Sequence, residues 1–176
     1  LHGVKGISVC PRRGPRTTVT AMLNLVLPKG SLEKATFQLF ADADLSIHRS
    51  SDVAYKATIG DPRIESVRIL RPQEIPVYVA DGLFDIGVCG RDWIEETSSE
   101  VVSLGEVAYS KATTNPIQMV VAVAGDAAWN SVADLPNGVK VSTEYPELTK
   151  RFFADAGIDA DVRLSYGATE AKVPDI

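Results

Sequence analysis

The sequence predicts an α/β fold built on mixed, mostly parallel sheets and divided into two lobes. Short apolar segments typical of buried strands alternate with segments whose apolar residues recur every three or four positions, as in amphipathic helices. Turns rich in glycine and proline separate the two kinds of segment. A polar, irregular stretch at residues 110–116 interrupts this order. We therefore expect a first lobe over residues 22–113 and a second over residues 114–176.

The middle of the first lobe, residues 70–96, predicts a helix, a strand, a tight turn and a second helix. We expect Pro72 to open the first helix, because proline suits the first helical position, and Gly82 to end it. The inward face of this helix would carry three apolar residues: Ile75, Val79 and Leu83. Residues 85–89 are apolar throughout their centre and predict a strand buried in a parallel sheet.

A glycine turn at residues 90–92 joins that strand to the second helix. Asp92 is expected to cap this helix, and Glu95, three residues later, would complete a capping box. A glycine turn between a strand and a helix N-terminus is a common anion-binding feature of α/β proteins. Arg71 and Arg91 both lie at predicted helix starts. The pattern indicates an anion-binding cleft, and ordinary helix capping without a ligand is the alternative.

The start of the first lobe repeats this strand, turn and helix order. Residues 23–27 predict a strand, and Ser31 is placed to cap the following helix. The apolar face of that helix would carry six residues: Leu32, Ala35, Thr36, Leu39, Phe40 and Ala43. Lys29 lies in the connecting turn, where it is either a ligand contact or a solvated lysine. A strand over residues 66–70 leads into Arg71, whereas residues 47–59 show no clear pattern.

The remaining elements are short. We expect strands over residues 101–107, 118–124, 139–142 and 161–165, and a short helix over residues 129–135. A longer helix begins near Pro146 and ends at Gly157. Its inward face would carry three residues: Leu148, Phe152 and Ala156.

Composition narrows the functional class. The 45% hydrophobic and 23% charged residues are typical of a globular protein, and no apolar run approaches the ~20 residues of a membrane helix. A net charge of −5 argues against nucleic acid as a partner. Two cysteines, one of them in a predicted buried strand, indicate a reducing compartment, so we expect a cytoplasmic protein. His2 and His48 lack the spacing of metal ligands.

Residues 1–21 differ from the rest of the chain. They carry four basic residues and no acid, and prolines, arginines and a glycine cluster at positions 11–16. They lack the apolar centre of a secretory signal. We predict a disordered tail or an extension upstream of the true start, with a basic transit peptide as the alternative.

Five segments taken together resemble the catalytic region of the ATP phosphoribosyltransferase family, in its order and spacing. They are LVLPKGSL at 25–32, LRPQEIP at 70–76, DIGVCGRD at 85–92, VSTEYP at 141–146 and GATEA at 167–171. The resemblance runs from about Met22 to Ile176. It implies the fold of type II periplasmic binding proteins, with two α/β lobes and a cleft between them.

The resemblance also implies an activity: transfer of a 5-phosphoribosyl group from phosphoribosyl pyrophosphate (PRPP) to N1 of ATP. This reaction releases pyrophosphate and is the first step of L-histidine biosynthesis. The family implies Mg²⁺ bound with the substrate phosphates, with no metal ligand assigned to this chain. It further implies a homo-oligomer, a dimer or a hexamer, or association with a regulatory subunit.

Motif positions carry the family's roles onto particular residues. Lys29 and Arg71 become the catalytic candidates, contacting pyrophosphate or triphosphate. The other substrate-binding candidates are Gly30, Lys56, Gly90, Arg91, Asp92, Tyr145 and Glu170. Among these, Asp92 and Tyr145 would line the adenine nucleotide site, and Glu170 would bind a ribose hydroxyl. The structural alternatives are a helix cap for Asp92, a helix-start aromatic for Tyr145 and a surface acid for Glu170.

Two departures from the family pattern affect these expectations. The family commonly has an arginine where this chain has Ser31, so one phosphate contact is expected to be missing. The PRPP-binding loop would follow Ile176, so we expect an incomplete second lobe and a weakly active or inactive chain. One alternative function is a two-lobed small-anion binding or sensory module without catalysis. Another is a transcription-factor effector domain, for which residues 1–21 supply no helix-turn-helix.

Overall fold

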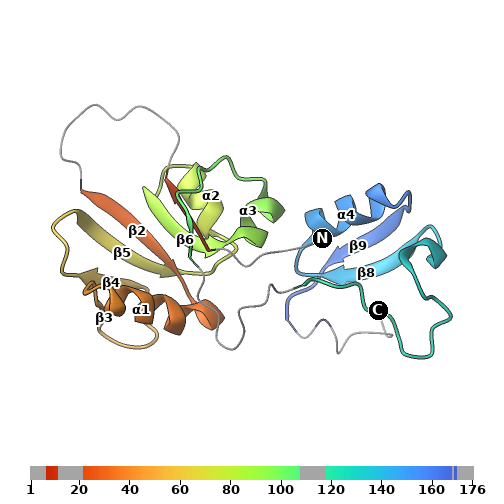
Figure 1. Cartoon of the computed structure of the whole chain (residues 1–176), viewed down its shortest axis with the longest axis horizontal. Helices are drawn as coiled ribbons and strands as arrows, with labels where there is room; N and C mark the ends of the chain where they lie inside the picture. Colours follow the sequence, from red (N-terminus) through yellow and green to blue (C-terminus); the bar gives the residue numbers. More distant parts are fainter. Residues whose placement is uncertain (1–6, 12–21, 108–117, 168, 170–176) are drawn as a thin grey trace. The chain divides into compact units, whose positions relative to one another are not determined.

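The chain divides into two compact units, Leu1–Gln118 and Met119–Ile176. The structure, a computed structural model, describes residues 7–11, 22–107, 118–167 and 169 (Figure 1). The predicted boundary at residue 113 lies among residues 108–117, which are outside the described residues.

The described part of the first unit forms a seven-stranded mixed sheet in the order β3-β4-β5-β2-β6-β1-β7. Its strands are β1 (Ile7–Pro11), β2 (Leu23–Pro28), β3 (Ile47–Arg49), β4 (Lys56–Ile59), β5 (Ile64–Leu70), β6 (Ile86–Gly90) and β7 (Glu106–Val107). The pairs β2–β5 and β2–β6 are parallel, and the outer pairs are antiparallel. The expected mixed sheet is confirmed, but parallel pairing in it is confined to the centre.

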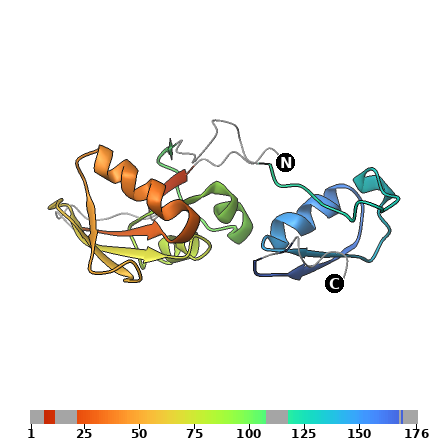
Figure 2. The ribbon, with the colours of Figure 1, turned by 90° about the horizontal axis from the view of Figure 1, so that it is seen from below.

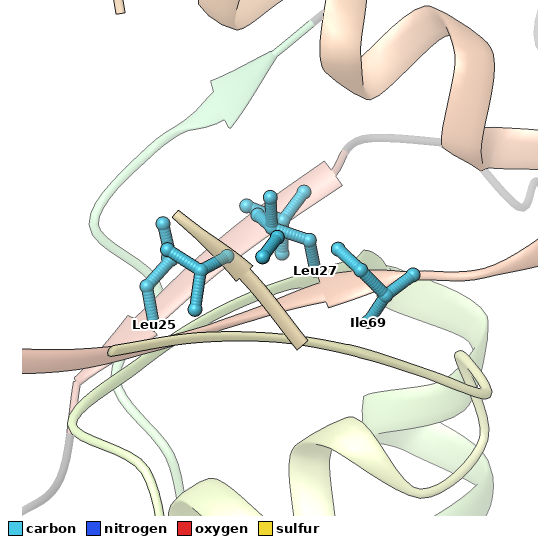
Figure 3. Packing of buried hydrophobic residues seen from close by; sticks show 6 residues of the cluster. Leu25, Leu27 and Ile69 are labelled. Carbon is cyan, nitrogen blue, oxygen red and sulfur yellow. The ribbon is translucent and has the colours of Figure 1, made fainter. Parts of the chain in front are cut away.

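Helices cover both faces of this sheet (Figures 1 and 2). The short 3₁₀ helix η1 (Gly30–Leu32) leads into α1 (Glu33–Asp42), and α2 (Ile75–Ala80) and α3 (Arg91–Thr97) follow later. Phe37 and Phe40 of α1 pack against one buried cluster that contains Leu25, Leu27 and Ile69 (Figure 3). Ile75 and Val79 of α2 form a second cluster with Val26 and Cys89.

Strand β2 is therefore buried on both faces, as expected for a central parallel strand. Leu25 and Leu27 contribute to the α1-side cluster, whereas Val26 contributes to the α2-side cluster. This alternation follows from the two-residue period of a strand. The strand predicted at residues 23–27 is confirmed, one residue longer.

Strand β1 contradicts the predicted disordered tail for residues 7–11. It lies between β6 and β7 and pairs antiparallel with both. The β-branched Ile7 and Val9 alternate with Ser8 and Cys10, which is a strand pattern that the neighbouring prolines and arginines obscured. Residues 1–6 and 12–21 lie outside the described residues.

Two predicted helix starts are wrong. Helix α2 begins at Ile75, because residues 72–74 form a turn in which the Glu74 N–H donates to the Arg71 carbonyl at 3.1 Å. Pro76, not Pro72, occupies the first turn of α2. Ser31 caps no helix, since it lies inside η1, and α1 follows with Leu32 at its N-cap.

The predicted end of α2 is confirmed, but its inward face is shorter than predicted. Gly82 has a φ of +76°, the left-handed conformation that glycine adopts at helix ends. Ile75 and Val79 are buried, whereas Leu83, which follows this turn, is 63% exposed. Ala43 likewise lies beyond the end of α1 and is exposed, contrary to its predicted place on the inward face.

One stretch contains strands that were not predicted, and two others differ from the predicted strands. Residues 47–59, which showed no clear pattern, contain the antiparallel pair β3–β4. The strand predicted over residues 101–107 is limited to β7. Residues 118–124 form no strand, and Met119, Val120, Val121 and Val123 are exposed. An apolar run becomes a strand only where a neighbouring backbone pairs with it, and none does among the described residues.

The second unit contains a parallel pair, β8 (Val139–Thr143) and β9 (Ala160–Leu164), connected through α4 (Pro146–Asp155). Pro146 in the first turn of α4 and Gly157 at a φ of +74° confirm the predicted helix ends. Leu148 is buried as predicted.

Two details of this unit correct the predictions. Phe153, not Phe152, is fully buried, and Ala156 is exposed because it follows the end of α4. The helix expected over residues 129–135 is the single 3₁₀ turn η2 (Val132–Asp134). A Ser131–Asp134 capping box caps its N-terminus. None of the helices in the described ranges has the length and apolar composition needed to cross a membrane.

Gly87 of β6 is required by close packing, and its replacement provides a test of the fold. A methyl group added there would lie 2.7 Å from Ile75 Cγ2 and 3.0 Å from Val79 Cγ2. We expect Gly87→Ala to destabilise the first unit by about 1–3 kcal/mol in urea unfolding, since overpacking forces a core to shift. Gly105→Ala is the matched control, with no atom within 4 Å of the added methyl group. Equal stability of the two variants would contradict this packing.

The turn between β4 and β5 predicts an acid-sensitive contribution to stability. The side chain and backbone N–H of Arg63 both donate to the Asp61 carboxylate and lower the pKa of Asp61 from 3.8 to about 2. A lowered carboxyl pKa stabilises the folded chain above the unfolded value, and this stabilisation is lost as pH falls through the folded value. The stability difference between the wild type and Asp61→Asn should therefore shrink from about pH 4 to about pH 2 in urea titrations. The exposed control Asp81→Asn should show no such trend.

Candidate active site

The carboxyl ends of the central parallel strands lie at one edge of the first-unit sheet, which we call the carboxyl edge. Pro28 at the end of β2 is paired with Leu70 at the end of β5, and the Lys29 N–H donates to the Leu70 carbonyl at 2.7 Å. Lys29 and Arg71 therefore follow adjacent strand ends. In open α/β sheets this edge is where ligands bind.

Lys29 lies in the turn between β2 and η1, where its backbone is extended. Its ammonium nitrogen lies 4.3 Å from the centroid of the Tyr55 ring, a cation–π contact. Gly30 has a φ of +84°, which accounts for a glycine at this position without any ligand. The strand-to-helix turn predicted around Lys29 is confirmed.

Arg71 and Lys56 bring further positive charge to the same edge. Arg71 is exposed just before the turn into α2. Lys56 begins β4, directly opposite Arg68 of β5, and like charges placed opposite each other are unfavourable unless an anion or solvent separates them. Within the described ranges, no carboxylate lies within ion-pair distance of Lys29, Lys56 or Arg71.

The capping box predicted at the start of α3 is wrong. The N-cap of α3 is Gly90, with a φ of −69° and a ψ of 144°, so Asp92 is the second residue inside the helix. Its Oδ1 accepts a hydrogen bond from the Trp93 N–H at 3.0 Å. Glu95 instead accepts a hydrogen bond from Arg91 Nε at 2.9 Å. A methyl group on Gly90 would overlap Asp92 Oδ1, so the glycine leaves room for this carboxylate.

Arg91 and Asp92 therefore differ from the other site candidates in their electrostatics. Arg91 is paired with Glu95 and with Glu106 of β7 at 3.5 Å, so its charge is offset within the protein. The Asp92 carboxylate places negative charge at the start of α3, which favours hydrogen-bond donors over a phosphate. The carboxyl edge thus has a cationic part at Lys29 and Arg71 and an accepting part at Asp92.

Tyr145 lies in the second unit, at the carboxyl end of β8. It is the N-cap residue of α4, and its N–H donates to Thr143 Oγ1 at 3.0 Å. Glu144 accepts a hydrogen bond from the Gly167 N–H at 2.8 Å and so ties together the ends of β8 and β9. Glu170 lies outside the described residues. The approach of Tyr145 and Glu170 to the first-unit residues stays a prediction.

Tyr55 was not among the predicted site residues, because its contact is with Lys29, which is remote in sequence. Its signal was an aromatic residue beside Lys56 at the end of a polar loop. No group of three or more histidine, cysteine, aspartate or glutamate side chains is arranged to hold a metal ion within the described ranges.

Comparison with known proteins gives consistent matches. A family model described as "HisG: ATP phosphoribosyltransferase" matches residues 71–175. Relatives named ATP phosphoribosyltransferase occur in Pelotomaculum thermopropionicum, with 47% identity over 152 residues, and in Desulforudis audaxviator, with 44% identity over 154 residues. These alignments cover 86% and 88% of this chain and 52% of each relative. The chain thus spans about half the length of the curated relatives it matches.

A solved structure supports the fold. It is described as "ATP phosphoribosyl transferase (HisG:HisZ) complex from Thermotoga maritima", and it matches with a TM-score of 0.60 and 21% sequence identity. The match covers 86% of this chain and 68% of that chain. The expected α/β fold is confirmed, and since the family model covers more than half of the sequence, this chain belongs to the ATP phosphoribosyltransferase family.

Proposed function

We propose that the protein containing this chain transfers the 5-phosphoribosyl group of PRPP to N1 of ATP and releases pyrophosphate, the first step of L-histidine biosynthesis. Family membership supports this activity. The structural observation that carries it is the placement of Lys29 and Arg71 on adjacent strand ends, unpaired with any carboxylate of the described residues. Two neighbouring cations without acidic partners suit a polyanionic ligand.

The reaction requires stabilisation of the charges that develop during bond breaking, rather than a nucleophile from the protein. As the bond between ribose C1 and pyrophosphate breaks, positive charge develops on the sugar and negative charge on the leaving group, as in glycosyl transfer. N1 of ATP is itself the nucleophile. The protein must orient two polyanions and stabilise the leaving group with fixed positive charge.

We assign this charge to particular residues. Arg71 and Lys29 bind the leaving pyrophosphate, Arg71 through its planar guanidinium and Lys29 through a point charge. Lys56 supplies further positive charge to the phosphates of ATP or PRPP. Arg91 has a structural role, because Glu95 and Glu106 offset its charge.

The adenine nucleotide and the ribose of PRPP are assigned to accepting and aromatic side chains. Asp92 accepts hydrogen bonds, so it suits a donor group of the nucleotide such as the base amine or a ribose hydroxyl. Tyr145 offers an aromatic face for the base. Glu170 accepts a hydrogen bond from a ribose hydroxyl of PRPP.

Magnesium and partners remain proposals as well. The carboxyl edge is cationic at Lys29 and Arg71, so we assign Mg²⁺ to the substrate phosphates and to no side chain. The solved Thermotoga maritima structure is a HisG:HisZ complex. By analogy, we expect this protein to work in the cytoplasm as an oligomer or with a regulatory subunit.

Pyrophosphate binding to this chain tests the cationic part of the carboxyl edge. We expect Arg71→Ala to weaken binding about ten- to a hundredfold in titration calorimetry, the usual effect of losing a hydrogen bond to a charged group. Arg91→Ala is the matched control and should bind within about twofold of the wild type, because its charge is already offset. Equal losses in the two variants would show that the edge does not discriminate between these arginines.

The activity itself is tested in the full polypeptide that the gene encodes. With ATP, PRPP, Mg²⁺ and a pyrophosphatase, the N1-substituted adenine nucleotide should appear as a rise in ultraviolet absorbance. Arg71→Ala and Glu170→Ala should each lower kcat/KM by about a hundredfold or more, and Lys34→Ala, on an exposed position of α1, should not. Nucleotide binding without product would favour a two-lobed binding module instead.

A further inference from the structure

The Lys29 ammonium lies against an aromatic ring rather than a carboxylate. The distance of 4.3 Å from Nζ to the Tyr55 centroid is well within the ~6 Å range of cation–π attraction. Tyr55 is 55% exposed, so its ring is not part of the hydrophobic core. The contact therefore needs an explanation other than core packing.

The contact crosses a strand end. In the order β4-β5-β2, the residue before β4 and the residue after β2 lie on either side of β5. Strands are spaced ~4.8 Å apart, so Lys29 must extend across the end of β5 to reach Tyr55. That strand end carries Leu70 and then Arg71. The ring thus draws the ammonium toward the strand end that Arg71 follows.

The backbone of Tyr55 is held from both sides of its loop. The Tyr55 carbonyl accepts a hydrogen bond from the Ile69 N–H at 2.9 Å. At the other end of the loop, the buried side chain of Arg49 is paired with Glu33 of α1 at 2.7 Å and lies over the Phe37 ring. Both anchors belong to the folded core of the first unit, so they hold the backbone of Tyr55 at the carboxyl edge.

We propose that Tyr55 is a positioning residue that holds the Lys29 ammonium in place for pyrophosphate. A lysine side chain otherwise loses rotamer freedom when a ligand fixes it in one position. A neutral ring restrains the ammonium without offsetting its charge, whereas the carboxylates beside Arg91 offset that residue's charge. This proposal rests on the proposed function for its ligand. The phenolic hydroxyl takes no part in this positioning, so a phenylalanine at position 55 should serve as well as tyrosine.

The test is a double-mutant cycle on pyrophosphate binding to this chain. We expect Tyr55→Leu to weaken binding about two- to fivefold, the range of an exposed cation–π contact, and Tyr55→Phe to bind as the wild type does. In a Lys29→Met background, Tyr55→Leu should have no further effect. Unchanged binding by Tyr55→Leu, or an equal loss without Lys29, would overturn the proposal.

A second measurement detects the contact between Lys29 and Tyr55 without any ligand. In NMR spectra of the wild type and Tyr55→Phe, the ring should shift the Lys29 side-chain methylene protons upfield. Tyr55→Leu should abolish this shift, while its other signals remain those of a folded chain. Absence of the shift in the wild type would overturn the positioning role. A wild-type chain that shows the shift but does not bind pyrophosphate would instead overturn the ligand assigned to Lys29, and the transferase assay of the full polypeptide tests the proposed function separately.

Discussion

The burial of β2 on both faces is the constraint on which the candidate site depends. Leu25 and Leu27 pack toward α1, and Val26 packs toward α2. Burying each such side chain contributes about 1.5–3 kcal/mol, and a slip of one residue would reverse the faces of the whole strand. The parallel register with β5 is therefore strongly specified, and it places Lys29 beside Arg71. The site's cations are positioned by apolar packing rather than by ion pairs.

The basic side chains of the first unit are of two kinds. Some have their charge offset by a carboxylate, and others at the carboxyl edge keep their charge available for a ligand. Arg91 is paired with two carboxylates, and Arg49 is buried against Glu33, so the charge of each arginine is offset within the protein. Lys29 instead contacts an uncharged ring. Asp92 brings negative charge to the start of α3, next to a glycine that makes room for it. Such an edge can receive an anion on one side and a hydrogen-bond donor on the other.

The features predicted correctly from sequence are those set by local chemistry. Apolar runs and glycine turns gave the strand, turn and helix order and the position of Lys29. The predicted helix caps were wrong because several residues within one turn can cap a helix. The backbone geometry makes Gly90, not Asp92, the N-cap of α3. Strand β1 and the Tyr55 contact were missed because each depends on a partner remote in sequence. Glu170 and Tyr145 remain assigned by resemblance alone.

The departure at Ser31 gives the Tyr55 contact its significance. The resemblance to the family implies an arginine at this position, where this chain has the hydroxyl of Ser31 on an exposed residue of η1. A hydroxyl donates one hydrogen bond and no charge, so in the proposed reaction the leaving pyrophosphate would be stabilised by fewer cations. Lys29 and Arg71 then carry a larger share of that stabilisation. With fewer cations, an ammonium whose position is fixed is worth more than one that samples many rotamers, since preorganised charge stabilises a transition state without reorganisation at the moment of reaction.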